Sequence, residues 1–124
     1  GKRPLSSMSP TLVFKDGQPI LTVGAAGGPT IITQTLLLIS NIVDQGMEPN
    51  EALRQPRFHQ QWTPDELKIE TTFDAETLRR VEAFGHKLEK SSGFGACQCV
   101  MWDAQRKLLV PAHDPRVPGK ADGL

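Results

Sequence analysis

The sequence predicts an α+β fold in which antiparallel hairpins pack against helices. Strand-forming residues flank a short polar turn twice, at residues 11–23 and 96–112. Apolar residues recur at helical spacing after Pro29 and again after Asp74. With 124 residues, 38% hydrophobic and 23% charged, the chain has the size and composition of one globular domain. We therefore expect residues 1–124 to form a single domain that ends in an irregular tail at residues 113–124.

The first hairpin is predicted from the residues around an Asp-Gly turn. Residues 11–15 are typical of a strand, and Asp16-Gly17 follows them directly. A two-residue hairpin turn needs a positive φ at both central positions, and Asp-Gly adopts this backbone readily. The return strand is expected at residues 20–23, with Pro19 at its start, where a missing N–H is tolerated.

A long helix is expected from Pro29 to Asp44. Proline suits the first position of a helix, where its absent N–H would have no partner in any case. Gly46 then ends the helix. Because apolar residues occupy nearly every side of this helix, it should need more covering than the rest of the chain supplies. The apolar residues are Ile31, Ile32, Leu36, Leu37, Leu38, Ile39, Ile42 and Val43.

Shorter elements are expected after this helix. Asn50 is predicted to cap a short helix at residues 51–54, which must end before Pro56. A short strand should occupy residues 67–70, where apolar and charged residues alternate.

The last third of the chain holds one more helix and a second hairpin. Asp74 should cap the helix, whose apolar face carries Leu78, Val81 and Phe84, and Gly85 should terminate it. The expected strands lie at residues 87–90, 96–102 and 107–112.

Composition excludes several classes of function. Fourteen basic residues balance fourteen acidic ones without a basic run, so we expect no nucleic-acid partner. No apolar stretch approaches the roughly 20 residues that span a bilayer, and no metal is expected because the three histidines lie in unrelated segments. Nothing points to a cofactor, since the Gly-x-Gly-x-x-Gly fingerprint is absent. Cys97 and Cys99 are expected to form a buried structural pair on one face of a strand.

The glycine pair Gly27-Gly28 is the first candidate site. Backbone N–H groups at a helix start are unpaired and lie at the positive end of the helix dipole. Glycine lets a ligand approach those donors, so the junction suits an oxyanion or a phosphate. The competing interpretation is a tight turn that needs glycine for its backbone conformation.

The second candidate is the serine cluster that includes Ser6 and Ser7. Their hydroxyl groups could bind a carboxylate just ahead of the first strand. Serines at such a place also serve as ordinary loop or turn residues.

Taken together, these segments resemble the small subunit of the γ-glutamyltransferase (glutathione hydrolase) family. Their order and spacing match that family over nearly all of the chain. The matching segments are Pro4-Leu5-Ser6-Ser7-Met8-Ser9-Pro10-Thr11, Asp16-Gly17, Gly27-Gly28, Pro56-Arg57-Phe58-His59-Gln60-Gln61-Trp62, Pro64-Asp65-Glu66-Leu67 and Asp114-Pro115-Arg116.

The resemblance implies an αββα N-terminal-nucleophile hydrolase, cut by self-cleavage into a large and a small subunit. A threonine at the new N-terminus attacks the γ-glutamyl carbonyl and forms an acyl-enzyme. The resemblance assigns the substrate's α-carboxylate to Ser6 and Ser7, and the oxyanion hole to Gly27 and Gly28. It places the threonine upstream of Ser6, so this chain alone should be inactive. The expected partners are the rest of the small subunit, the large subunit and a γ-glutamyl substrate, in the periplasm or outside the cell.

Two other functions stay open at this level. The same fold could act as a stand-alone protein that binds a partner or a small anion without catalysis. A phosphate-binding module at Gly27-Gly28 is a weaker alternative, because no lysine or arginine lies beside the glycines. The chain also departs from the family pattern with Ala25-Ala26 before the glycines and Pro29-Thr30 after them.

Overall fold

A computed structural model describes residues 1–3 and 5–122, and it confirms the α+β class. Pro4 of the first matching segment and residues 123–124 of the expected tail lie outside the described residues. Contacts divide the chain into two compact units, one made of Gly1–Gln55 and Gly95–Leu124, the other of Pro56–Phe94. The single domain expected from the sequence stays a prediction.

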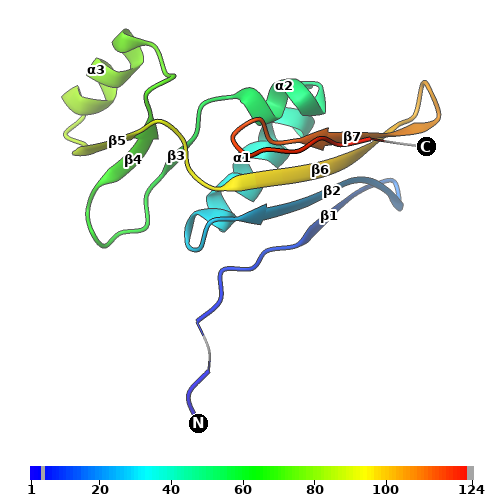
Figure 1. Cartoon of the computed structure of the whole chain (residues 1–124), viewed down its shortest axis with the longest axis horizontal. Coiled ribbons are helices and arrows are strands. Elements are labelled where there is room, and N and C mark those ends of the chain that lie inside the picture. Colours follow the sequence, from blue (N-terminus) through cyan, green and yellow to red (C-terminus); the bar gives the residue numbers. More distant parts are fainter. Residues whose placement is uncertain (4, 123–124) are drawn as a thin grey trace. The chain divides into compact units, whose positions relative to one another are not determined.

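The first unit is built on a four-stranded antiparallel sheet of order β1-β2-β6-β7 (Figure 1). Two helices pack against one face of this sheet. The strands are β1 (Thr11–Lys15), β2 (Gln18–Ala26), β6 (Ala96–Asp103) and β7 (Leu108–His113), and the helices are α1 (Thr30–Val43) and α2 (Pro49–Arg54).

Both expected hairpins are confirmed. In the β1–β2 turn, Asp16 has a φ of 51° and Gly17 a φ of 76°, the left-handed backbone that Asp-Gly supplies. Lys15 then pairs with Gln18 across the turn. The second hairpin joins β6 to β7, with Asp103 opposite Leu108.

The core lies between the sheet and the two helices. Leu21, Val23, Cys97 and Cys99 are buried on the helix side of the sheet. They pack with buried helix residues, among them Leu38, Ile42 and Leu53. Since alternate strand residues point to opposite faces, the neighbouring positions Leu12, Trp102 and Leu109 face away from the helices and are exposed.

Helix α1 covers the sheet with only one of its faces. Its outer side leaves Ile32, Leu36 and Val43 exposed at 57%, 63% and 47% of their surface. A helix with apolar residues on several sides, packed on a two-layer unit, buries one stripe and presents the other to solvent. Within the first unit, part of the apolar surface of this helix stays uncovered, as expected.

Two details of the expected helices are wrong. Asn50 does not cap α2, because Pro49 is its first residue and the carbonyl of Glu48 accepts the Ala52 N–H at 2.9 Å. Proline has the fixed φ that a first helical position needs, and it thereby moves the start ahead of Asn50. Phe84 does not lie on the apolar face of the last helix, since it follows that helix as its C-cap and is 77% exposed.

The second unit is a three-stranded sheet of order β3-β4-β5. Its elements are β3 (Phe58–His59), β4 (Leu67–Glu70), α3 (Ala75–Ala83) and β5 (Leu88–Ser91). The parallel β4–β5 pair is connected through α3. The expected cap is confirmed, because Asp74 accepts the Thr77 N–H at 2.8 Å. No helix of the described chain is both long and apolar enough to cross a membrane.

Candidate functional site

The junction between β2 and α1 has a backbone that only glycine adopts easily. Gly27 has a φ of 138° and Gly28 a φ of 60°. A Cβ atom at Gly27 would lie 2.6 Å from Thr30 Oγ1 and 3.0 Å from Gly95 Cα. A Cβ at Gly28 would meet nothing within 4 Å. Gly27 is therefore packed against the protein, whereas Gly28 borders open space.

The two glycines use their carbonyl groups but not their N–H groups within the described chain. Gly27 O accepts the Thr30 N–H at 3.4 Å, and Gly28 O accepts the Ile31 N–H at 3.1 Å. Among residues 1–3 and 5–122, neither glycine N–H donates to a protein acceptor. Two adjacent donors are thus available directly ahead of Pro29, the N-cap of the 14-residue helix α1. Such a pair can stabilise a negatively charged oxygen.

Behind the glycines lies a buried glutamine that sequence analysis did not single out. Gln34, in α1, is 1% exposed. Its Nε2 donates to Ala26 O at 3.1 Å and to Thr30 Oγ1 at 2.9 Å. Thr30 Oγ1 in turn donates to Gly27 O at 2.9 Å. The sequence carried no signal for this role beyond a lone amide in an apolar helix.

The serine segment precedes β1 and has a turn-like structure. Met8 N donates to Ser6 Oγ at 3.3 Å, which leaves the Ser6 hydroxyl proton able to serve another acceptor. Ser9 Oγ donates to Ser7 O at 3.1 Å. Ser6 is exposed and Ser7 is half-buried. Both hydroxyl groups can therefore reach a ligand.

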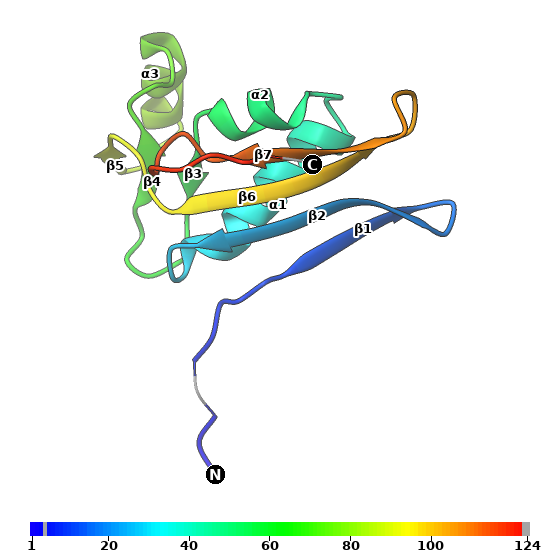
Figure 2. The same ribbon diagram turned by 45° about the vertical axis from the view of Figure 1, so that its right-hand side comes forward.

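The structure keeps the two candidate segments in one unit but does not join them. Thr11, the first residue of β1, pairs with Val23 of β2, and the residues before Thr11 leave the sheet (Figure 2). Among the described residues, no hydrogen bond connects the Ser6-Ser7 segment with Gly27-Gly28. A pocket on the open face of the sheet is lined by β1, β2 and β6, and includes none of the four candidate residues.

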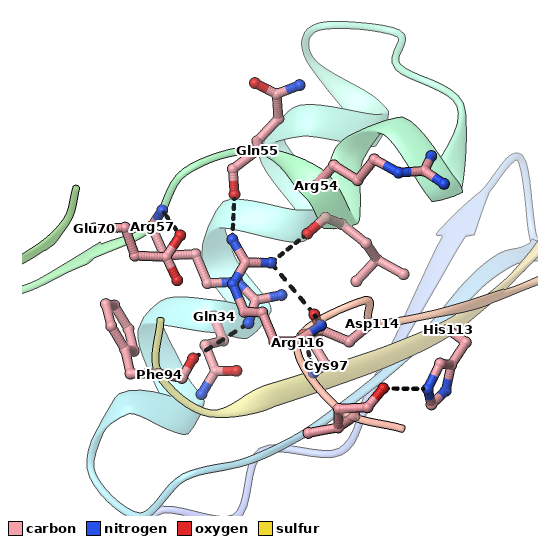
Figure 3. A network of polar contacts seen from close by, with 12 residues as sticks. Gln34, Arg54, Gln55, Arg57, Glu70, Phe94, Cys97, His113, Asp114 and Arg116 are labelled. Carbon is pink, nitrogen blue, oxygen red and sulfur yellow. Dashed lines mark hydrogen bonds and ion pairs between the residues drawn. The ribbon is translucent and has the colours of Figure 1, made fainter. Parts of the chain in front are cut away.

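A buried ion pair closes the C-terminal end of β7 (Figure 3). Asp114 is fully buried and accepts the Cys97 N–H at 2.8 Å and the Arg116 N–H at 3.0 Å. The Arg116 guanidinium reaches Asp114 Oδ1 at 3.3 Å, Leu53 O at 2.6 Å and Gln55 O at 2.9 Å. This cluster ties α2 to β6 and to the residues after β7. Its role is structural.

The two cysteines are buried, as expected, and both are free. Burial in the core, together with the neighbouring Cys97 thiol, raises the pKa of Cys99 to about 12. A protonated, buried thiol is neither a nucleophile nor a metal ligand at neutral pH. Within the described part of the chain, no cluster of three or more His, Cys, Asp or Glu residues could hold a metal ion.

Comparison with known proteins identifies the family to which the chain belongs. The model of the family described as Gamma-glutamyltranspeptidase matches residues 1–124. A glutathione hydrolase proenzyme of Escherichia coli (strain K12) is 46% identical over 115 residues, which cover 93% of this chain and 20% of that protein.

Two solved structures have the same fold. A mutant gamma-glutamyltranspeptidase of Helicobacter pylori is 39% identical with a TM-score of 0.86, over 94% of this chain and 64% of that one. The Pseudomonas nitroreducens gamma-glutamyltranspeptidase complexed with L-DON is 30% identical with a TM-score of 0.89, over 100% and 65%. The chain thus spans less than two thirds of the solved chains and a fifth of the proenzyme.

Proposed function

Because the chain belongs to the gamma-glutamyltranspeptidase family, we propose that it is the C-terminal portion of the small subunit of such an enzyme. The family consists of enzymes of glutathione metabolism with the N-terminal-nucleophile hydrolase fold, as the resemblance implied. The complete protein is proposed to transfer or hydrolyse the γ-glutamyl group of glutathione and related compounds. The reaction is proposed to pass through a threonine acyl-enzyme.

The observation that carries the proposal is the pair of available N–H groups on Gly27 and Gly28. When the threonine oxygen attacks the γ-glutamyl carbonyl, that carbonyl oxygen becomes an oxyanion. Two adjacent backbone donors at a helix start can stabilise this charge without rearranging. The open space beside Gly28 leaves room for the reacting carbonyl, while Gly27 packs against the protein.

The substrate's α-carboxylate is proposed to bind the serine segment. A carboxylate accepts charge-assisted hydrogen bonds, and the Ser6 and Ser7 hydroxyl groups are placed to donate them. Among the described residues no hydrogen bond links this segment to the glycines, so the substrate and further parts of the enzyme are proposed to bridge them. The proposed partners are therefore the rest of the small subunit and the large subunit.

Substitutions in the complete enzyme test the two assignments separately. Each serine bond is worth about 1.5–3 kcal/mol, so Ser6→Ala or Ser7→Ala should raise KM for a γ-glutamyl anilide about ten- to a hundredfold. Ser40→Ala is the matched control, since its hydroxyl bonds to Asp44 at the far end of α1. Precursor processing should stay intact in all three variants.

Gly28→Val should act on turnover instead. A branched side chain at a φ of 60° displaces the donor, and losing one oxyanion donor lowers kcat about 10²- to 10³-fold. Gly46→Val is the matched control, because Gly46 has a φ of 69° and equally open surroundings beyond the other end of α1. Unchanged kinetics in a folded, processed Gly28→Val enzyme would refute the oxyanion assignment. Unchanged KM in both serine variants would refute the carboxylate assignment.

A further inference from the structure

We propose that Gln34 and Thr30 act as positioning residues that orient the Gly27 and Gly28 N–H groups toward the oxyanion. The inference rests on the proposed function of Gly27 and Gly28. Neither side chain would touch the substrate in this arrangement. They would act through the two peptide groups that carry the donors.

The argument follows from the planarity of the peptide bond. The carbonyl of Ala26 and the N–H of Gly27 belong to one peptide group and point in opposite directions. The carbonyl of Gly27 and the N–H of Gly28 form the next group. Gln34 Nε2 holds the first carbonyl at 3.1 Å, and Thr30 Oγ1 holds the second at 2.9 Å. Anchoring both carbonyl oxygens inside the protein therefore directs both N–H groups outward.

Gln34 and Thr30 form a hydrogen-bond relay to the two carbonyl oxygens, and each proton of the relay has one acceptor. The Gln34 amide has two protons, one for Ala26 O and one for Thr30 Oγ1. Thr30 accepts the second proton and gives its own hydroxyl proton to Gly27 O. Chained hydrogen bonds polarise one another, so the relay also strengthens the two N–H donors at its outer end.

Burial and close packing hold the glutamine in place. Gln34 is 1% exposed. The backbone of Gly95, the residue before β6, lies against its amide, so that a Cβ there would come within 2.5 Å of Gln34 Cδ. The Gln34 amide therefore cannot move toward Gly95. Its packing against Gly95 and its hydrogen bond to Ala26 O together fix the distance between α1 and the Gly27-Gly28 loop.

The first test is Gln34→Leu in the complete enzyme, with Thr35→Val as control. Leucine keeps most of the side-chain volume and removes both donors. We expect kcat per processed enzyme to fall about ten- to a hundredfold, since a small misalignment of catalytic groups costs up to about 10²-fold. KM should stay within about threefold, because the donors act on the transition state. Thr35 is also buried in α1 but makes no bond to the Gly27-Gly28 loop, so Thr35→Val should keep wild-type kcat.

The second test uses Gln34→Glu and separates positioning from simple stability. A buried carboxyl has a raised pKa. In its neutral form it can donate one hydrogen bond of the relay, whereas in its charged form it donates none and places a negative charge behind the oxyanion. The ratio of the variant's kcat to that of the wild type should therefore rise as the pH falls. A purely structural role would leave this ratio flat across the pH range in which both enzymes remain folded.

The outcomes distinguish this inference from the proposed function. If Gly28→Val lowers kcat while Gln34→Leu stays within threefold of wild type, the positioning role is wrong and the oxyanion site stands. If Gly28→Val also leaves kcat unchanged, the proposed function fails at this site. A loss in Gln34→Leu that Thr35→Val reproduces would overturn the positioning role as well.

Discussion

Removing the Asp114 carboxylate should destabilise the first unit more than any surface substitution in it. In Asp114→Ala, the Cys97 N–H loses its acceptor inside the core. The Arg116 guanidinium, whose side chain is 16% exposed, loses its ion pair with the Asp114 carboxylate. Breaking a buried ion pair from one side typically costs about 3–5 kcal/mol. We expect the lower end of that range, because Leu53 O and Gln55 O still accept from Arg116.

That loss is large against the roughly 5–15 kcal/mol that stabilise a typical domain. Asp114→Asn should lose less, since one amide oxygen can still accept the Cys97 N–H. Its NH₂ group, however, would face the donors of Arg116. The expected order of stability is therefore wild type, then asparagine, then alanine.

The assay is the urea midpoint of the complete processed enzyme, compared among these variants. Asp122→Ala is the matched control, because its ion pair with Lys120 is exposed and such pairs contribute about 0–1 kcal/mol. A midpoint for Asp114→Ala no lower than that of Asp122→Ala would refute the reasoning. If instead the slope of the unfolding free energy against urea concentration changed, the variant would have altered the compactness of the native or the unfolded state.

Three further predictions concern the chain itself. Made alone, the chain should not hydrolyse γ-glutamyl anilides, and turnover that survives repurification would contradict this. It should also self-associate through exposed α1 residues such as Leu36, which a monodisperse monomer in sedimentation would contradict. Cys99 should resist a thiol reagent at pH 8 until the enzyme is denatured, and a rapid native reaction would count against it. Since its folded pKa of about 12 exceeds the ordinary 9.0, the stability it contributes is complete below pH 9 and is lost as the pH rises toward 12. Thr35→Val should raise the urea midpoint, because it removes a buried hydroxyl with no hydrogen-bond partner in the described chain; a lowered midpoint would show that the hydroxyl is satisfied.

Local features of this fold could be predicted from the sequence because neighbouring residues decide them. Asp16-Gly17 supplies the backbone of its turn directly. Asp74 caps α3 through a residue only three positions away. The placement of Cys97 and Cys99 on one face of β6 follows from strand alternation alone. The Gly27-Gly28 junction could also be proposed as an anion site, since a helix start leaves its N–H groups unpaired wherever it lies.

Features that depend on distant residues could not be predicted in this way. Arg116 binds the carbonyl of Leu53, which lies 63 positions earlier, and no local pattern connects the two. Strand β3 has two residues, too few for a periodic signal. The relay behind the glycines depends on Gly95 approaching Gln34, a contact that forms only when β6 pairs with β2. The sequence alone located the glycine pair proposed to donate to an oxyanion, whereas the tertiary structure decided what holds its peptide groups, because orientation comes from packing between segments and not from propensity within one.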